Sequence, residues 1–293
     1  MSLHHSTGAV TLDRLGPGDL LEVFGYLDRD PVVNVYLLAL ALRDGLARPR
    51  DEFWAVRRDG ELVGLLCLGG QSGAVLPLGD DAAALRLLAD QAAARLAFLP
   101  RRFQVIGPRE AVAAVVERLD ARGLAPRVRR AQLYMAVPRG SLAPGERLPE
   151  LRPARPEDYD LVFHSGAGLR AEELEEDPRA VDPLAYARRV EEECRDGYTW
   201  LWVADGALRF RASVSALTSD AVQISGVYTP PALRNRGHAT RALTELCTRL
   251  FHRAGAACLF VNDFNAPALA VYRRLGFEDR AAWASAFYEA PRP

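Results

Sequence analysis

The chain consists of two stretches, each of roughly 150 residues, whose landmarks recur in the same order. Each stretch contains two apolar segments that meet at an Asp-Gly pair, Asp59-Gly60 in the first and Asp205-Gly206 in the second. Asp and Gly tolerate the positive φ angles of a tight hairpin turn, so both pairs predict β-hairpins. A period this long indicates a duplicated domain and excludes a solenoid of short repeats.

The elements predicted after each hairpin also match between the two stretches. A short strand, an amphipathic helix, an apolar strand, a second helix and an aromatic strand follow in turn. Both second helices end at a glycine followed by an apolar residue, Gly123-Leu124 and Gly276-Phe277, as a glycine C-cap requires. Since Pro138–Pro149 is rich in Pro and Gly, we predict an α/β chain with domains at 9–138 and 150–290 and a linker at 139–149.

Composition excludes several classes of protein. The net charge is -1, which disfavours a nucleic-acid partner held by a basic field. All 37 basic residues are arginine, which excludes a P-loop lysine and a Schiff-base lysine. The 4 cysteines form no C-x-x-C pair, so we expect reduced thiols and no metal site.

The apolar segments argue against a membrane protein. Met1–Val10 lacks the apolar core of a signal peptide, and Val32–Leu42 is too short to span a bilayer. We therefore expect a cytoplasmic protein without a membrane partner, either a monomer or a homodimer.

The segment that begins at Gly226 has the pattern of an anion site. A strand is predicted to end near Thr229, and a helix to start near His238, with a tight loop between them. Gly237 lets the backbone turn closely, so the amides from Arg236 to Thr240 can point at one phosphate group. The helix N-terminus adds about half a positive charge, and the arginines of the loop can add charge-assisted hydrogen bonds.

This loop, Arg234-Asn-Arg-Gly-His-Ala239, resembles the [R/Q]-x-x-G-x-[G/A] acetyl-CoA signature of the GNAT superfamily of N-acetyltransferases. The resemblance implies that the loop amides hold the pyrophosphate of acetyl-CoA, and that the main chain at Val227 and Thr229 pairs with the pantetheine arm. The cofactor-binding residues that it implies are Val227, Tyr228, Thr229, Arg234, Asn235, Arg236, Gly237, His238, Ala239, Thr240, Asn265 and Ala268.

A second match lies at the family's spacing downstream, in Asn265-Ala-Pro-Ala-Leu-Ala-Val-Tyr272. By resemblance Asn265 packs near the pantetheine, and Tyr272 faces the thioester sulfur as general acid. Asn265 is also a plausible N-cap with Pro267 in the first turn. Tyr272 has an alternative interpretation, because an aromatic residue at helical spacing is usually part of a core.

The general base is less well marked. Many GNAT enzymes carry a glutamate on the strand before the phosphate loop, but Ala221–Thr229 has no acidic residue here. Glu173 is our candidate base, with Glu172 and Asp263 as the other possibilities. Solvated surface carboxylates are the alternative interpretation for each of them.

The first half lacks the residues that characterise the predicted phosphate loop of the second half. Its corresponding position is Gly79-Asp-Asp81, where carboxylates would repel a pyrophosphate, and Val112 and Leu119 stand where Asn265 and Tyr272 would be expected. The pattern resembles bacterial tandem-domain GNAT proteins. It implies two acyl-CoA N-acyltransferase folds, each a mixed, mostly antiparallel sheet flanked by helices, the first of them degenerate.

The function predicted from these residues is acetyl transfer from acetyl-CoA to a primary amine of a small-molecule acceptor. The alternative is a non-catalytic acyl-CoA-binding or sensing protein. Gly166-Ala-Gly-Leu-Arg-Ala171 also fits a dinucleotide fingerprint, but that fingerprint needs a preceding strand and the residues before it predict a helix. A tRNA-linked substrate would need a basic track, and the only hint of one is Arg127, Arg129 and Arg130, beside Arg101 and Arg102. A solvated arginine face is the alternative interpretation of these residues.

Overall fold

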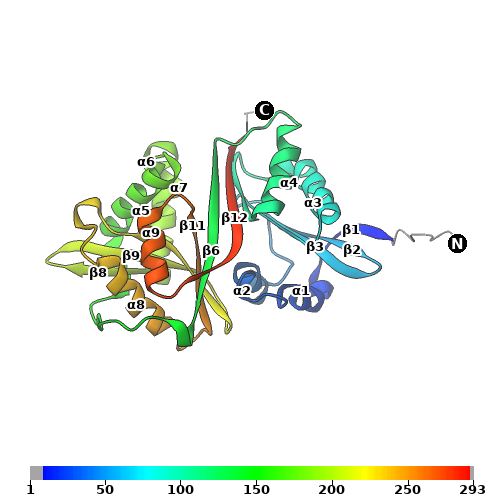
Figure 1. The fold of residues 1–293 in the computed structure, drawn as a ribbon. Coiled ribbons are helices and arrows are strands. Elements are labelled where there is room, and N and C mark those ends of the chain that lie inside the picture. The colour runs from blue at the N-terminus through cyan, green and yellow to red at the C-terminus, as the bar shows by residue number, and fades with distance from the viewer. Residues whose placement is uncertain (1–8, 291–293) are drawn as a thin grey trace. The chain divides into compact units, whose positions relative to one another are not determined.

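The computed structural model describes residues 9–290, so the polar start of the chain lies outside the described residues. The chain forms two compact units. The first runs up to Leu133 and takes in the chain again from Ala281, and the second is Tyr134–Arg280 (Figure 1). Each unit is a mixed, mostly antiparallel sheet with helices on its faces, as the sequence predicted.

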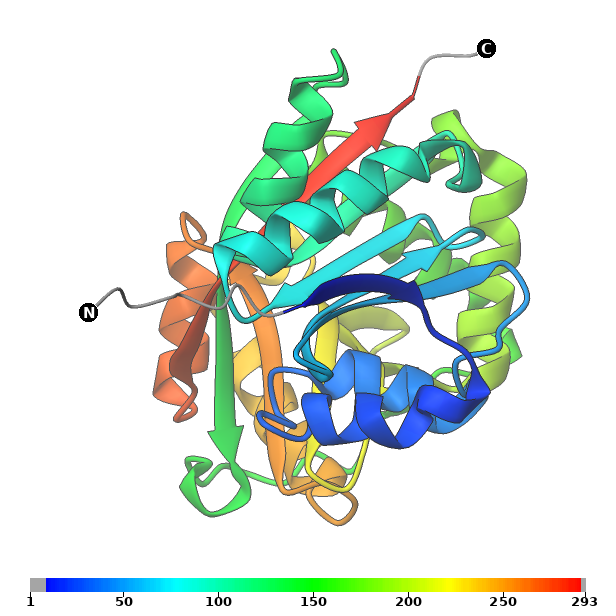
Figure 2. The same cartoon turned by 90° about the vertical axis from the view of Figure 1, so that its right-hand side faces the viewer.

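The sheet of the first unit has the order β1-β2-β3-β4-β5-β12, and only β4 and β5 in it are recorded as parallel neighbours. Its strands are β1 (Val10–Arg14), β2 (Asp51–Arg58), β3 (Glu61–Gly69), β4 (Ala74–Gly79), β5 (Arg102–Pro108) and β12 (Glu278–Glu289). Helices α1 (Leu20–Leu27) and α2 (Val35–Asp44) cover one face, and α3 (Ala82–Ala94) and α4 (Arg109–Asp120) cover the other (Figure 2).

Each face of this sheet has its own apolar core. Leu65 and Phe53 are buried against α1 and α2, while Leu66 and Val105 are buried against α3 and α4. The strands therefore read as nearly continuous apolar runs, because a sheet covered on both faces buries successive side chains on opposite sides.

The turns and caps predicted from the sequence are confirmed. Asp59 and Asp205 have φ of 53° and 52°, and the glycine after each also has a positive φ. They join β2 to β3 and, in the second unit, β8 (Thr199–Ala204) to β9 (Ala207–Leu217), both antiparallel. Gly123 and Gly276 follow α4 and α9 (Ala266–Arg274) with φ of 78° and 94°, the left-handed conformation of a C-cap glycine.

The sheet of the second unit has the order β6-β11-β10-β9-β8-β7. Its remaining strands are β6 (Val128–Pro138), β7 (Arg152–Pro153), β10 (Ala221–Tyr228) and β11 (Ala256–Asn262). Helices α5 (Tyr159–Leu174) and α7 (Pro183–Asp196), which the short α6 (Pro178–Val181) connects, lie on one face. Helices α8 (His238–Leu250) and α9 lie on the other (Figure 2).

The last strand of each half is exchanged. We expected each half to close its own sheet, but β12 pairs antiparallel with β5 of the first unit, from Trp283↔Pro108 to Glu289↔Arg102. From Tyr134 onward β6 belongs to the second unit, where the fully buried Tyr134 hydroxyl donates to Cys258 Sγ over 3.1 Å. The residue pattern predicts that a strand is present but not which strand it pairs with. The exchange of β6 and β12 between the two sheets could therefore not be predicted.

The segment between the predicted domains is held against helix α8. Glu245 of α8 is only 2% exposed. One of its carboxylate oxygens accepts from Leu148 N and Arg147 Nε, and the other accepts from Arg249 Nε. Arg249 in turn donates to the carbonyl oxygens of Leu148 and Leu151. These bonds make 147–151 a strap over the helix that follows the predicted phosphate loop.

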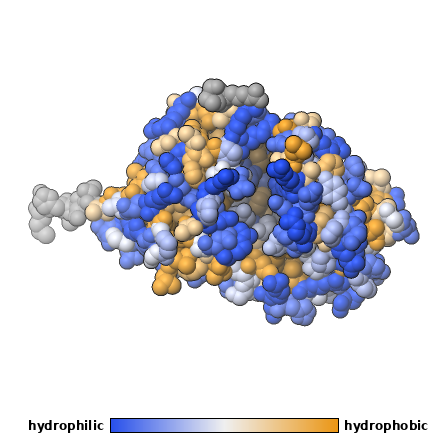
Figure 3. All heavy atoms as spheres, turned by 180° about the vertical axis from the view of Figure 1, so that it is seen from behind, coloured by the Kyte–Doolittle hydropathy of each residue, from blue (hydrophilic) through white to orange (hydrophobic). Residues whose placement is uncertain are grey.

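The helices and the surface can be compared with those of a membrane protein and of a dinucleotide-binding protein. No helix among residues 9–290 is long and apolar enough to cross a membrane. The face seen in Figure 3 is mostly hydrophilic, with apolar side chains in small patches. Gly166 and Gly168 lie inside α5, as predicted, so the apparent dinucleotide fingerprint is helical and lacks the required strand–turn–helix context.

We expect Glu245→Ala to lower the free energy of unfolding by about 3 kcal/mol, because it leaves Arg249 and the Leu148 amide without their buried carboxylate. Urea denaturation measures this change. Glu146→Ala is the matched control, since that side chain is 86% exposed and its loss should change stability by less than about 0.5 kcal/mol. Equal stabilities for the two variants would show that the strap contributes nothing.

Candidate functional site

Two parallel strands of the second unit diverge where the site is predicted. Strands β10 and β11 pair only over their first residues, from Ala221↔Ala256 to Gln223↔Cys258. Beyond these pairs the two strands separate. On its other side β10 has a bulge, since Gly226 and Val227 lie between the pairs Ser225↔Ser213 and Tyr228↔Arg211. A bulge removes residues from the ladder and re-aims them. The main chain predicted to meet the pantetheine is therefore irregular, with Gly226 at a φ of 59°.

The loop after β10 ends at the start of α8. Asn235 and Gly237 have φ of 60° and 78°, and Gly237 is the N-cap of the helix. Glycine has no side chain with which to cap, and within the described chain no side chain caps this helix. The first-turn amides of His238, Ala239 and Thr240 therefore have no side-chain cap, which is the arrangement that helix-start anion sites use. Residues 234–237 are exposed, so a ligand can reach them.

Arginines surround this helix start. The pKa of His238 is lowered by burial and by the nearby charges of Arg209, Arg236 and Arg241. Burial is the largest cause of this shift, and the part due to the three arginines reflects a positive field of the kind that suits a diphosphate. Trp202 of β8 packs edge-on against His238 at 4.9 Å and lies under the Arg241 guanidinium at 5.6 Å. Sequence reasoning missed Trp202 and Arg209, because no local motif marks these positions on β8 and β9.

Arg234 has a different set of contacts from those predicted. Its Nη2 donates to both carboxylate oxygens of Glu172 on α5, at 2.7 and 2.8 Å, and its Nε donates to the Thr229 carbonyl at 3.0 Å. The guanidinium lies 5.7 Å from the centre of the Tyr228 ring. Glu172 is thus engaged as an ion-pair partner, which makes it a poor candidate for the base.

Helix α9 holds the second motif. The Asn265 side chain accepts from Ala268 N at 3.2 Å and is the N-cap of the helix, as predicted. Tyr272 is 6% exposed and packs against Phe277 at 5.8 Å. Burial raises the pKa of Tyr272 well above its ordinary value of 10, and the Glu173 carboxylate raises it further. The phenol is therefore protonated at neutral pH and can donate a hydrogen bond, and the Glu173 carboxylate is near enough to influence its pKa.

Two glycines let α5 approach the site. A Cβ at Gly168 would lie 3.0 Å from the Tyr228 hydroxyl, and one at Gly166 would lie 2.7 Å from the Tyr186 hydroxyl. Close packing brings the end of α5, with Glu172 and Glu173, beside the coenzyme loop. The glycines that imitate a dinucleotide motif are packing positions.

In the first unit, a side chain fills the position that corresponds to the predicted anion site. Asp81 is the N-cap of α3, and its Oδ1 accepts from the amides of Ala83 and Ala84 at 2.9 Å each. Arg58 donates to its other oxygen at 2.7 Å and, with the helix amides, holds the pKa of Asp81 at about 2. A carboxylate of the chain thus takes the place that a phosphate has in the predicted site.

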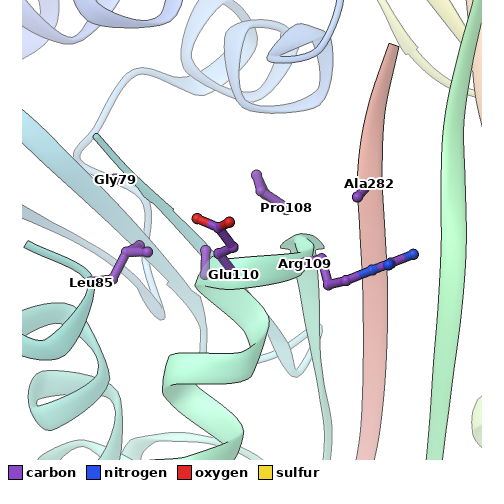
Figure 4. A pocket seen from close by; sticks show the side chains of 7 residues that line it. Gly79, Leu85, Pro108, Arg109, Glu110 and Ala282 are labelled. Carbon is purple, nitrogen blue, oxygen red and sulfur yellow. The ribbon is translucent and has the colours of Figure 1, made fainter. Parts of the chain in front are cut away.

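A small pocket remains at the ends of β4 and β5 in this unit. Its volume is about 240 Å³, and it is lined by Gly79, Leu85, Pro108, Arg109, Glu110, Ala111 and Ala282. The Glu110 carboxylate lies between the side chains of Leu85 and Pro108 (Figure 4). The pocket is smaller than the ~300–1,000 Å³ usual for ligand sites. Val112 and Leu119, predicted to replace the site residues, are both buried in the core.

The second unit thus combines splayed parallel strands, an uncapped helix start beside arginines, and a protonated buried tyrosine. Residues 168–277 match the model of the Acetyltransferase (GNAT) family, and this segment is a GNAT domain. Residues 51–162 match a domain family of unknown function, DUF4081. In the part of the chain that the structure describes, no group of three or more potential ligands could hold a metal ion.

Solved structures share the fold over nearly the whole chain. A Drosophila protein superposes with a TM-score of 0.66 at 15% identity, over 96% of this chain and 99% of its own. A GCN5-related N-acetyltransferase from Sphaerobacter thermophilus gives 0.59 at 15% identity and 97% of each chain. A tandem GNAT protein from the clavulanic acid biosynthesis pathway gives 0.53 at 19% identity, over 97% of this chain and 100% of its own. No curated protein sequence matches the chain. Family and fold together support acyl transfer as its general chemistry.

We expect Asp81→Ala to lower the free energy of unfolding by about 1 kcal/mol at pH 7, the usual cost of removing an N-cap. Because the folded-state pKa is lowered to about 2 from 3.8, this contribution is complete above pH 4 and disappears as the pH falls towards 2. Urea denaturation of both proteins between pH 7 and pH 3 tests it. Asp90→Ala, an exposed change on the same helix, is the control, and a pH-independent difference would contradict the capping role.

Proposed function

We propose that the chain transfers an acetyl group from acetyl-CoA to a primary amine of a small-molecule acceptor. The observation that carries the proposal is the start of α8, where Gly237 leaves the first-turn amides uncapped among Arg209, Arg236 and Arg241. The equivalent helix in the first unit is capped by Asp81, so an open helix start is not a general property of this fold. A diphosphate is the ligand that best matches those amides and charges.

The proposed reaction is direct transfer. The neutral amine attacks the thioester carbonyl, the N–C bond forms and the C–S bond breaks. The amine proton passes to Glu173, and the departing thiolate accepts a hydrogen bond from Tyr272. Full protonation by Tyr272 is unfavourable, because burial and Glu173 raise the pKa of the phenol above its ordinary 10, whereas a thiol titrates near 8.5.

The lack of a well-marked general base limits which amines can serve as the acceptor. Deprotonating a lysine-like amine at pH 7 costs roughly 4.6 kcal/mol, and an α-amine only about 1 kcal/mol. Strand β10 offers no carboxylate for this step, and the pair Glu172–Arg234 removes one of the three candidates. An acceptor with a low amine pKa is therefore favoured.

The first experiment is coenzyme binding. At a hundredfold excess over its dissociation constant, acetyl-CoA should stabilise the protein by about 2.7 kcal/mol, seen as a rise in melting temperature. Gly237→Asp places a carboxylate at the N-cap of α8, in imitation of Asp81, and should weaken binding about tenfold or more, because a favourable helix-terminus interaction of up to ~2 kcal/mol becomes repulsive. Two controls separate charge from backbone strain: Gly237→Asn meets the same positive φ without a charge, and Ser219→Asp adds the charge at an exposed position, so both should bind much more tightly than Gly237→Asp. Binding unaffected by Gly237→Asp would refute the proposed coenzyme site.

The second experiment concerns Tyr272. We expect Tyr272→Phe to lower turnover by roughly a hundredfold with little change in acetyl-CoA affinity, because the hydrogen bond to the thiolate forms only as the C–S bond breaks. Thiol release with a panel of amines measures turnover, and calorimetry measures affinity. Tyr198→Phe, an exposed position, is the control. Unchanged turnover would remove Tyr272 from the mechanism, and coenzyme binding without turnover on any amine would favour the sensing alternative.

A further inference from the structure

Arg170 is a half-buried arginine whose guanidinium has no partner among the described residues. It lies on α5, and among the described residues its guanidinium makes no hydrogen bond and no ion pair, with a buried Nε left unsatisfied. Burial is the largest influence on this group and lowers its pKa. An unpaired charge in such a place destabilises the fold, so proteins rarely keep one without a use.

One of the two carboxylates that act on Arg170, that of Glu193, is already committed to other partners. Glu193 of α7 accepts from Arg211 Nη2 and Thr199 Oγ1 on one oxygen, at 3.1 and 3.2 Å, and from Arg189 Nε on the other, at 3.2 Å. Arg211 is itself 4% exposed, and its Nε is also buried without a partner. The charges that act on Arg170 are those of Arg189, Glu176 and Glu193. Together with Arg170 and Arg211, these groups carry three positive and two negative charges, before Glu173 of the proposed reaction centre is counted.

The excess charge lies next to the proposed reaction centre. Arg170 and Glu173 are three residues apart on α5 and so share one face of the helix, less than one turn of 5.4 Å apart along its axis. Glu173 acts on Tyr272, and the adjacent Glu172 holds Arg234 of the coenzyme loop. A short molecule can therefore place its amine at Glu173 and an anionic group at Arg170.

We propose that Arg170 binds a carboxylate of the acceptor, so that the acceptor is an amine that carries a carboxylate a few bonds away, as amino acids do. The inference rests on the proposed function. The ligand supplies the anion that Arg170 lacks, and a carboxylate suits it because it can accept two hydrogen bonds from one guanidinium. The unpaired arginine is then a preformed specificity site, and its cost to stability is recovered when substrate binds.

The test compares amino acids with their carboxamides as acceptors, by thiol release from acetyl-CoA. A carboxamide has nearly the same shape, and its α-amine has the lower pKa, so intrinsic reactivity favours the amide. We expect the wild type to prefer the acid roughly tenfold to a hundredfold in kcat/KM, the range for hydrogen bonds to charged groups. Arg170→Met should reduce this ratio to about one or below, and Arg188→Met, which removes an exposed arginine of α7, should keep it. Equal use of acids and amides by the wild type, or a preference retained in Arg170→Met, would overturn the proposal.

A stability measurement separates this role from a structural one. Removing an unpaired buried charge should raise the melting temperature of the free protein by about 2–4 °C for each kcal/mol gained. A fall on Arg170→Met would show that the guanidinium supports the fold and would overturn the proposal. Acetyl-CoA binding without acetylation of any amino acid would also reject the carboxylate site. Absence of acetyl-CoA binding would instead refute the proposed function, while the melting temperatures would still report on Arg170.

Discussion

The backbone amides at the start of a helix need partners, and this chain meets that need in two opposite ways. In the first unit Asp81 supplies its own carboxylate to the amides of Ala83 and Ala84. In the second unit Gly237 stands at the cap position and leaves them open. The same fold thus contains one helix start closed by the protein and one that suits a phosphate. We interpret the first unit as structural for this reason.

Helix α5 connects the parts of the proposed site. Gly166 and Gly168 let it approach Tyr186 and Tyr228 more closely than any other residue would. Its last turns then bring Glu172 to Arg234 and Glu173 into the field of Tyr272. In the proposed function, acceptor recognition and coenzyme binding therefore both depend on one packed helix, and Arg170 lies on it.

Predictions from the sequence succeeded where the cause is local. The Asp-Gly turns, the Gly123 and Gly276 caps and the Asn265 cap depend on a few adjacent residues, and the structure has all of them. The start of α8 at His238 was predicted for the same reason. The carboxylates of the first unit were expected to repel a phosphate, and Asp81 does more than that, because it takes the phosphate's place.

The sequence by itself therefore determined the turns, the caps, the duplication and the GNAT loop, since each follows from residue type and short spacing. Only the tertiary structure decided that β12 pairs with β5, that Arg234 binds Glu172, and that Glu193 is shared so that Arg170 has no partner. These contacts join residues that are distant in the sequence. For each residue, the chain offers several possible partners of the same chemical type. The choice among them is made by packing, which no short pattern of residues records.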